Sequence, residues 1–132
     1  MPKISDLARF FMLPILLVLW NAILTMTGTY DKFSWLGMPM HFVGGIFIAY
    51  AFLLTFDSLK KEKYFKLNMA FTVVFVISLV SLFAVLWEFY EFGVDYFFHL
   101  NYQPSLPDTM FDLFLGLFGG LISSAFFILR KN

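Results

Sequence analysis

Cysteine is absent from the chain, which excludes disulfide bonds, thiolate zinc sites and cysteine nucleophiles. Charge is scarce as well, because Asp, Glu, Lys and Arg make up 14% of the 132 residues, against about 25% in ordinary soluble proteins. The nine basic and nine acidic residues balance each other, so no basic excess favours nucleic-acid binding. We therefore expect neither a disulfide-stabilised domain nor a nucleic-acid-binding protein.

Apolar side chains are what the chain has in excess. Hydrophobic residues make up 61% of it and aromatic residues 22%, and the mean hydropathy is +0.81. Four apolar stretches each approach the roughly 20 residues that a helix needs to cross about 30 Å of hydrocarbon. Short loops between them favour antiparallel neighbours. We expect an all-α integral membrane protein, a four-helix antiparallel bundle forming one transmembrane domain over residues 1–132, with helices at 10–27, 39–56, 67–92 and 109–129.

The first apolar stretch also has features of a signal peptide, since Lys3 and Arg9 precede it. It is longer than the apolar core of such a peptide, and residues 25–28 make a poor cleavage site. We therefore expect a membrane-spanning helix here.

The Lys and Arg residues predict the orientation in the membrane. Eight of the nine lie before the first stretch, between the second and third, or after the fourth, and Lys32 is the exception. Cytoplasmic loops carry the excess of Lys and Arg in membrane proteins. We expect both termini to be cytoplasmic in a multi-pass protein of the cell (inner) membrane. The eight residues are Lys3, Arg9, Lys60, Lys61, Lys63, Lys66, Arg130 and Lys131.

Five acidic residues have no basic neighbour in the sequence, and they lie near the outer ends of the last two stretches. They are Glu88, Glu91, Asp95, Asp108 and Asp112. The first three are spaced by three and then four residues, which places them on one helix face, and the last two are four residues apart. His41 begins the second stretch at the same predicted depth. The topology thus predicts that these side chains meet in the outer leaflet, on the extracytoplasmic side.

Small residues continue the same helix faces toward the cytoplasm. Gly45 follows His41 by four residues, Gly116 follows Asp112 by four, and Ala84 precedes Glu88 by four. Small residues allow helix backbones to approach closely in lipid. We expect these faces to form the bundle interior, with the polar cluster as its outer cap.

Five carboxylates in a confined space cannot all stay ionised without compensation. No Lys or Arg is near them in the sequence, so the candidates are shared protons and a bound divalent cation. An imidazole with several carboxylates suits Zn, Mg or Mn, and the identity of the metal stays open. The predicted metal ligands are His41, Glu88, Asp108 and Asp112.

Several of these residues also have simpler explanations. Glu91, Asp95 and Asp108 lie close enough to the membrane interface to be solvated charges. Asp108 also matches a capping box that begins at Ser105. His41 could bond to a backbone carbonyl at the helix start.

Polar and aromatic residues flank the cluster. Asn21 and Thr25 are four residues apart in the first stretch, and they either face the cluster or join two helices by a hydrogen bond. Trp87 and Tyr30 are expected in the outer belt of aromatic residues.

Three short motifs resemble those of known membrane proteins: M-H-F-x-G-G at 40–45, W-E-x-x-E at 87–91 and D-T-x-x-D-L-x-x-G at 108–116. In these motifs the chain resembles the small bacterial integral membrane proteins of the YjdF and VanZ-like type. The VanZ-like group is associated with resistance to glycopeptide antibiotics. The resemblance implies functional roles at His41, Trp87, Glu88, Glu91, Asp108, Thr109 and Asp112.

Three functions remain open at this point. The first is metal-dependent hydrolysis of a lipid or lipid-linked headgroup, with Glu91 or Asp95 as the general base; the lack of Lys or Arg to hold phosphate counts against it. The second is a cation or proton carrier or a channel component, because carboxylates inside membranes often mark ion pathways. The third is a non-enzymatic membrane subunit that the cluster stabilises. Membrane lipids are the expected partners in each case.

Overall fold

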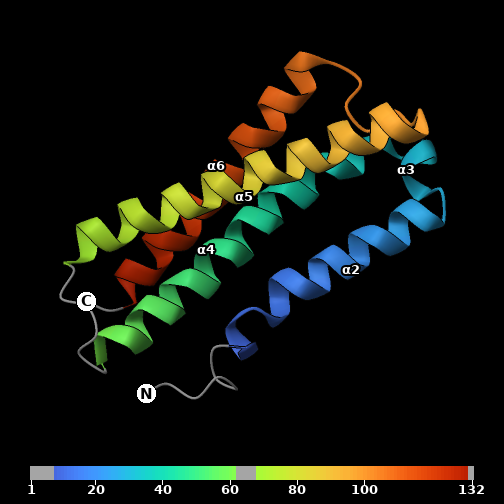
Figure 1. Ribbon diagram of the computed structural model, residues 1–132. Coiled ribbons are helices and arrows are strands. Elements are labelled where there is room, and N and C mark those ends of the chain that lie inside the picture. The colour runs from blue at the N-terminus through green and yellow to red at the C-terminus, as the bar shows by residue number, and fades with distance from the viewer. Residues whose placement is uncertain (1–7, 62–67, 131–132) are drawn as a thin grey trace.

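The computed structural model describes residues 8–61 and 68–130, and all the regular structure within them is helical. Predictions that concern Lys3, Lys63, Lys66 and Lys131 lie outside the described residues. Figure 1 shows α2 standing to one side of the other three long helices. The elements are α2 (Met12–Met26), α3 (Thr29–Lys32), η1 (Ser34–Leu36), α4 (Gly37–Lys61), α5 (Met69–Phe98) and α6 (Leu106–Leu129).

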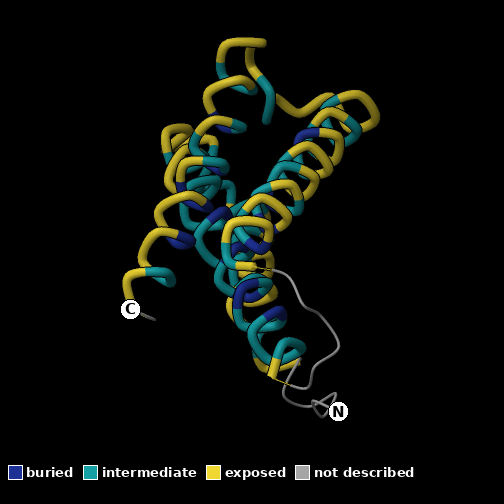
Figure 2. The backbone as a smooth tube through the Cα atoms, turned by 90° about the vertical axis from the view of Figure 1, so that its left-hand side faces the viewer, coloured by how far each residue is buried: buried dark blue, intermediate teal, exposed yellow. Residues whose placement is uncertain are grey.

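Three of these helices are long and apolar enough to cross a membrane: α4 together with η1, α5 and α6. The fourth, α2, is apolar but has 15 residues. Large apolar side chains such as Phe71, Phe75 and Phe89 on α5 are more than half exposed, as lipid-facing residues are. Figure 2 shows buried residues on the helix sides that face one another and exposed residues on the outer sides. The chain is therefore an all-α membrane protein.

Two observed helix ends differ from the bounds predicted from the apolar stretches, each for an identifiable reason. A helical turn at residues 8–10 ends at Phe11, and α2 begins at Met12. Pro14 explains this break, because its ring clashes with a helical carbonyl four residues earlier and it has no N–H to donate. At the other end, α5 continues past Phe92 to Phe98 and stops where His99 adopts the left-handed conformation at φ 55°.

The tightest packing in the described structure is between α4 and α6. A Cβ atom added at Gly45 would overlap the carbonyl oxygen of Gly116, and one added at Gly119 would overlap the carbonyl oxygen of Phe42. The two backbones thus touch through their small residues, as the sequence predicted. Below this contact, Ala49 and other buried side chains complete a small core with α5.

We predict that Gly45→Ala destabilises the protein by about 1–3 kcal/mol or more, the range for overpacked sites, because the new methyl group collides with backbone atoms. Gly93→Ala is the matched control, since a Cβ at Gly93 meets no atom within 4 Å. The free energy of unfolding of the detergent-purified protein, measured by titration with dodecyl sulfate, checks both variants. Equal stabilities of the two variants would contradict the close contact between α4 and α6.

Candidate metal centre

The contact between α4 and α6 fixes the relative positions of His41 and Asp112. Each lies one helical turn before a glycine of that contact, Gly45 on α4 and Gly116 on α6. As a result, His41 Nε2 lies 3.5 Å from Asp112 Oδ2 across the interface. Both side chains are 8% exposed.

The third helix adds Glu88 to this pair. Glu88 Oε1 lies 3.8 Å from His41 Nδ1, and the Glu88 side chain is 6% exposed. One potential ligand atom from each of His41, Glu88 and Asp112 lies within 4.8 Å of the other two. Three helices that are distant in sequence therefore bring one imidazole and two carboxylates together. The ring of His41 faces carboxylates, which does not fit the simpler explanation of a histidine held by a backbone carbonyl.

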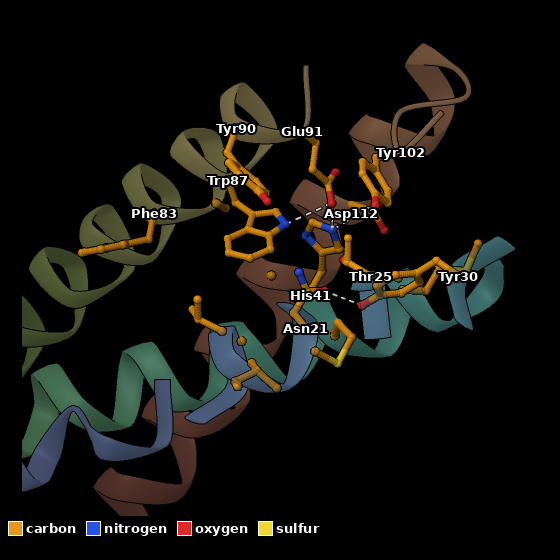
Figure 3. Close-up of a pocket in the computed structure, with 18 of the residues that line it drawn as sticks. Asn21, Thr25, Tyr30, His41, Phe83, Trp87, Tyr90, Glu91, Tyr102 and Asp112 are labelled. Carbon is orange, nitrogen blue, oxygen red and sulfur yellow. Dashed lines mark hydrogen bonds and ion pairs between the residues drawn. The ribbon is translucent and has the colours of Figure 1, made fainter. Parts of the chain in front are cut away.

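Glu91 borders the cluster one turn farther along α5. Its Oε1 atom lies 4.0 Å from His41 Nε2 and accepts a hydrogen bond of 3.0 Å from Trp87 Nε1. Figure 3 shows the side chains of Glu91, Asp112 and His41 grouped together with the Trp87 indole beside them. Trp87, expected in the aromatic belt, therefore orients a carboxylate at the edge of the cluster.

Two carboxylate oxygens in the cluster are buried without a hydrogen-bond partner among the described residues: Glu88 Oε1 and Asp112 Oδ1. A buried polar atom left unpaired costs about 1–3 kcal/mol, and more when it is charged. None of the described residues that line the surrounding cavity is Lys or Arg. The arrangement thus presents unpaired negative oxygens that a proton or a metal cation would satisfy.

Gln103 holds Glu88 in place, and no sequence pattern predicted this contact. Its Nε2 atom donates to Glu88 Oε2 at 2.6 Å and to the Glu88 carbonyl at 2.9 Å. A single glutamine in a loop belongs to no spacing pattern, so sequence reasoning could not find it. The bond leaves Glu88 Oε1 as the oxygen that faces His41.

Asp95 lies outside the convergent cluster. Its two carboxylate oxygens accept hydrogen bonds of 2.8 Å from the backbone N–H groups of Tyr102 and Gln103. These bonds fix the loop that carries Gln103 to Glu88. The predicted role of Asp95 as a general base stays a prediction, while its contacts are those of a residue that positions the loop.

Asp108 lies in the first turn of α6, where Ser105 Oγ accepts a bond of 3.3 Å from its backbone N–H. This contact confirms the expected helix cap at Ser105. Asp108 lines the same cavity as the cluster but is not one of the three residues whose ligand atoms converge. Its predicted role as a metal ligand stays a prediction.

The cavity beside the cluster has a volume of about 1110 Å³, and α2 and α3 close one side of it. Tyr30 donates a hydrogen bond to Asn21 Oδ1, and both residues line the cavity with Thr25. Burial, with smaller contributions from Glu91 and Tyr102, raises the pKa of the Tyr30 hydroxyl to about 12. The hydroxyl therefore stays protonated at neutral pH and serves as a donor at the rim of the site.

Comparison with known proteins identifies one family, described as "Predicted membrane protein (DUF2238)", which the chain matches over residues 3–132. Searches of curated proteins and of solved structures find no match. The match covers nearly the whole chain and agrees with its all-helical, apolar architecture. The chain belongs to this family of membrane proteins.

Proposed function

We propose that the protein is a metal-dependent hydrolase that acts on lipid or lipid-linked headgroups at the outer leaflet. His41, Glu88 and Asp112 would hold a divalent ion, for which Zn, Mg and Mn are the candidates. The observation that carries the proposal is the pair of buried, unpaired carboxylate oxygens beside one imidazole. Asp108, one turn from Asp112 on the wall of the same cavity, is the candidate for a further ligand.

A divalent ion at this position would lower the pKa of a bound water and polarise the scissile ester. Glu91 is the proposed general base, because it borders the cluster and Trp87 fixes its carboxylate. The water oxygen forms a bond to the phosphorus or acyl carbon while Glu91 takes its proton. The bond to the leaving oxygen then breaks, and that oxygen receives the proton from Glu91. Asp95 and Gln103 position Glu88 through the loop.

The proposal includes the topology expected from the sequence, with four spans and cytoplasmic termini. The position of the cluster supports it, since His41 opens α4 and the basic pair Lys60 and Lys61 closes it. About 30 Å of helix separates the two ends, which is the thickness of the hydrocarbon layer. The cluster would therefore lie at the level of the outer headgroups. The resemblance to YjdF and VanZ-like proteins is part of the same proposal.

A cation or proton carrier receives less support from the cavity. An ion pathway would need polar or titratable groups beyond the cluster. The described residues that line the inner part of the cavity are apolar, among them Ile48, Val80 and Phe83. We therefore favour hydrolysis over transport. The hydrolytic activity of the variants below distinguishes an enzyme from a non-enzymatic subunit.

Metal content tests the ligand set. We expect about one divalent ion per chain in the wild-type protein purified in detergent, and below about one tenth in His41→Ala and Asp112→Asn, because three protein ligands are few enough that losing one releases the ion. Asp57→Asn makes the same chemical change as Asp112→Asn at the far end of α4 and should keep the wild-type content. Elemental analysis by mass spectrometry provides the measurement. A wild-type protein that contains no divalent metal would exclude the proposed metal site.

Activity tests the proposed base. Glu91→Gln should retain the metal and the fold but lower headgroup release about 10²–10⁴-fold, the contribution typical of a general base. The assay follows phosphate-containing products from vesicles of phosphatidylglycerol or of a polyprenyl-linked phosphate ester, with Asp57→Asn, which lies near the far end of α4 and does not line the cavity, as the control. Unchanged turnover in Glu91→Gln would exclude Glu91 as the base. Loss of the metal in that variant would reassign Glu91 as a ligand.

A further inference from the structure

The cavity extends well beyond the metal cluster, and its lining changes character along its length. The outer part is polar, with His41, Glu91 and Asp112 on one side and Asn21 and Tyr30 on the other. The inner part is apolar. It is lined by Ile15, Val18, Ile48 and Val80, among others.

Three aromatic rings bound the inner end of the cavity. Phe52 on α4 contacts Phe11, which precedes α2, at 5.2 Å between ring centroids, and it contacts Phe83 on α5 at 5.8 Å. All three residues line the cavity. From His41 to Phe52, α4 advances about 16 Å, which is the length of the cavity wall from the polar cluster to the aromatic rings.

The cavity opens sideways between α2 and α5. Ile15, Val18 and Leu19 on α2 are 49–55% exposed, and Phe83 and Tyr90 on α5 are 41% and 52% exposed, yet all five line the cavity. These half-exposed side chains form the edges of the cavity, which is not fully enclosed. The principal contact of α2 is with α4, and its contact with α5 is marginal at most. In a bilayer, the surroundings of this opening are acyl chains.

We propose that one acyl chain of a membrane phospholipid enters this opening and lies in the apolar part of the cavity, with its headgroup beside His41 and Asp112. Water is a poor occupant of the inner part, because the apolar walls offer it no hydrogen bonds. The volume of about 1110 Å³ slightly exceeds the roughly 300–1,000 Å³ of ordinary ligand sites. The assignment of the headgroup as substrate rests on the proposed hydrolase function, whereas binding of the chain rests on the shape and lining of the cavity.

The carboxylates at the outer end determine how the headgroup is held. The cavity wall offers no Lys or Arg among the described residues, so a phosphate there would meet Glu91 and Asp112 without a protein cation. A divalent ion held by His41, Glu88 and Asp112 would offset this repulsion. The apolar contacts of the acyl chain then contribute to lipid binding in place of ion pairs between the phosphate and basic side chains.

Trp87 provides a local probe, because it lines the cavity between the polar and apolar parts. The variant Trp20→Phe/Trp35→Phe leaves Trp87 as the remaining tryptophan of the three. In detergent micelles, we expect phosphatidylcholine brominated in the middle of one acyl chain to quench Trp87 fluorescence saturably, at about one lipid per chain.

Filling the cavity should abolish this binding. Ile15→Phe/Val18→Phe adds two rings on the lining face of α2 and should weaken the apparent affinity at least about tenfold, because several methylene groups of the lipid lose their burial. Leu13→Phe/Leu16→Phe is the matched control on the same helix, with exposed residues that do not line the cavity. If the double variant does not elute as a monodisperse protein, Val18→Phe and Leu16→Phe give the same comparison.

The outcomes separate the two proposals. Saturable quenching that the lining variant loses and the control keeps supports chain binding, even if the wild-type protein contains no metal. Quenching that rises without saturation and equally in both variants shows contact with bulk lipid alone and overturns the inference. Normal metal content in Ile15→Phe/Val18→Phe would show that an altered binding curve reflects the cavity and not the metal centre.

Discussion

The contact between the backbones of α4 and α6 is the constraint on which the rest of the described structure depends. No side chain separates Gly45 from the carbonyl of Gly116, or Gly119 from that of Phe42. This contact fixes both the distance and the rotation of the two helices. Because His41 and Asp112 each lie one turn above it, their side chains meet. A larger residue at Gly45 would separate the helices and the cluster with them.

The second level of organisation is the loop between α5 and α6, which orients what the helices bring together. Asp95 binds the backbone of the loop, and Gln103 binds both the carbonyl and the carboxylate of Glu88. One oxygen of Glu88 is thereby occupied, and the other faces His41. The site thus combines a well-positioned imidazole and two carboxyl groups with two buried carboxyl oxygens that lack a hydrogen-bond partner among the described residues, which a proton or a cation would satisfy.

The four long helices differ in how closely they pack against one another, and this difference fits the proposed function. The group of α4, α5 and α6 is tight and carries the candidate ligands, whereas α2 has its main contact with α4 alone. The space that this leaves joins the polar cluster to the apolar part of the cavity, where we place the acyl chain. An enzyme that acts on a lipid headgroup needs both parts, a rigid site for the chemistry and a route for the chain.

The sequence by itself determined the class of the protein and the composition of its helix faces. Apolar length predicted membrane helices, and the spacing of Glu88 and Glu91 placed both carboxylates on one side of α5. The tertiary structure alone decided which acidic residues converge, since it joins Glu88 and Asp112 to His41 and turns Asp95 toward the loop. Helical periodicity gives the angle of a residue about its own axis, but the rotation between neighbouring helices, the path of a loop and the position of Gln103 follow from packing and hydrogen bonds between distant parts of the chain.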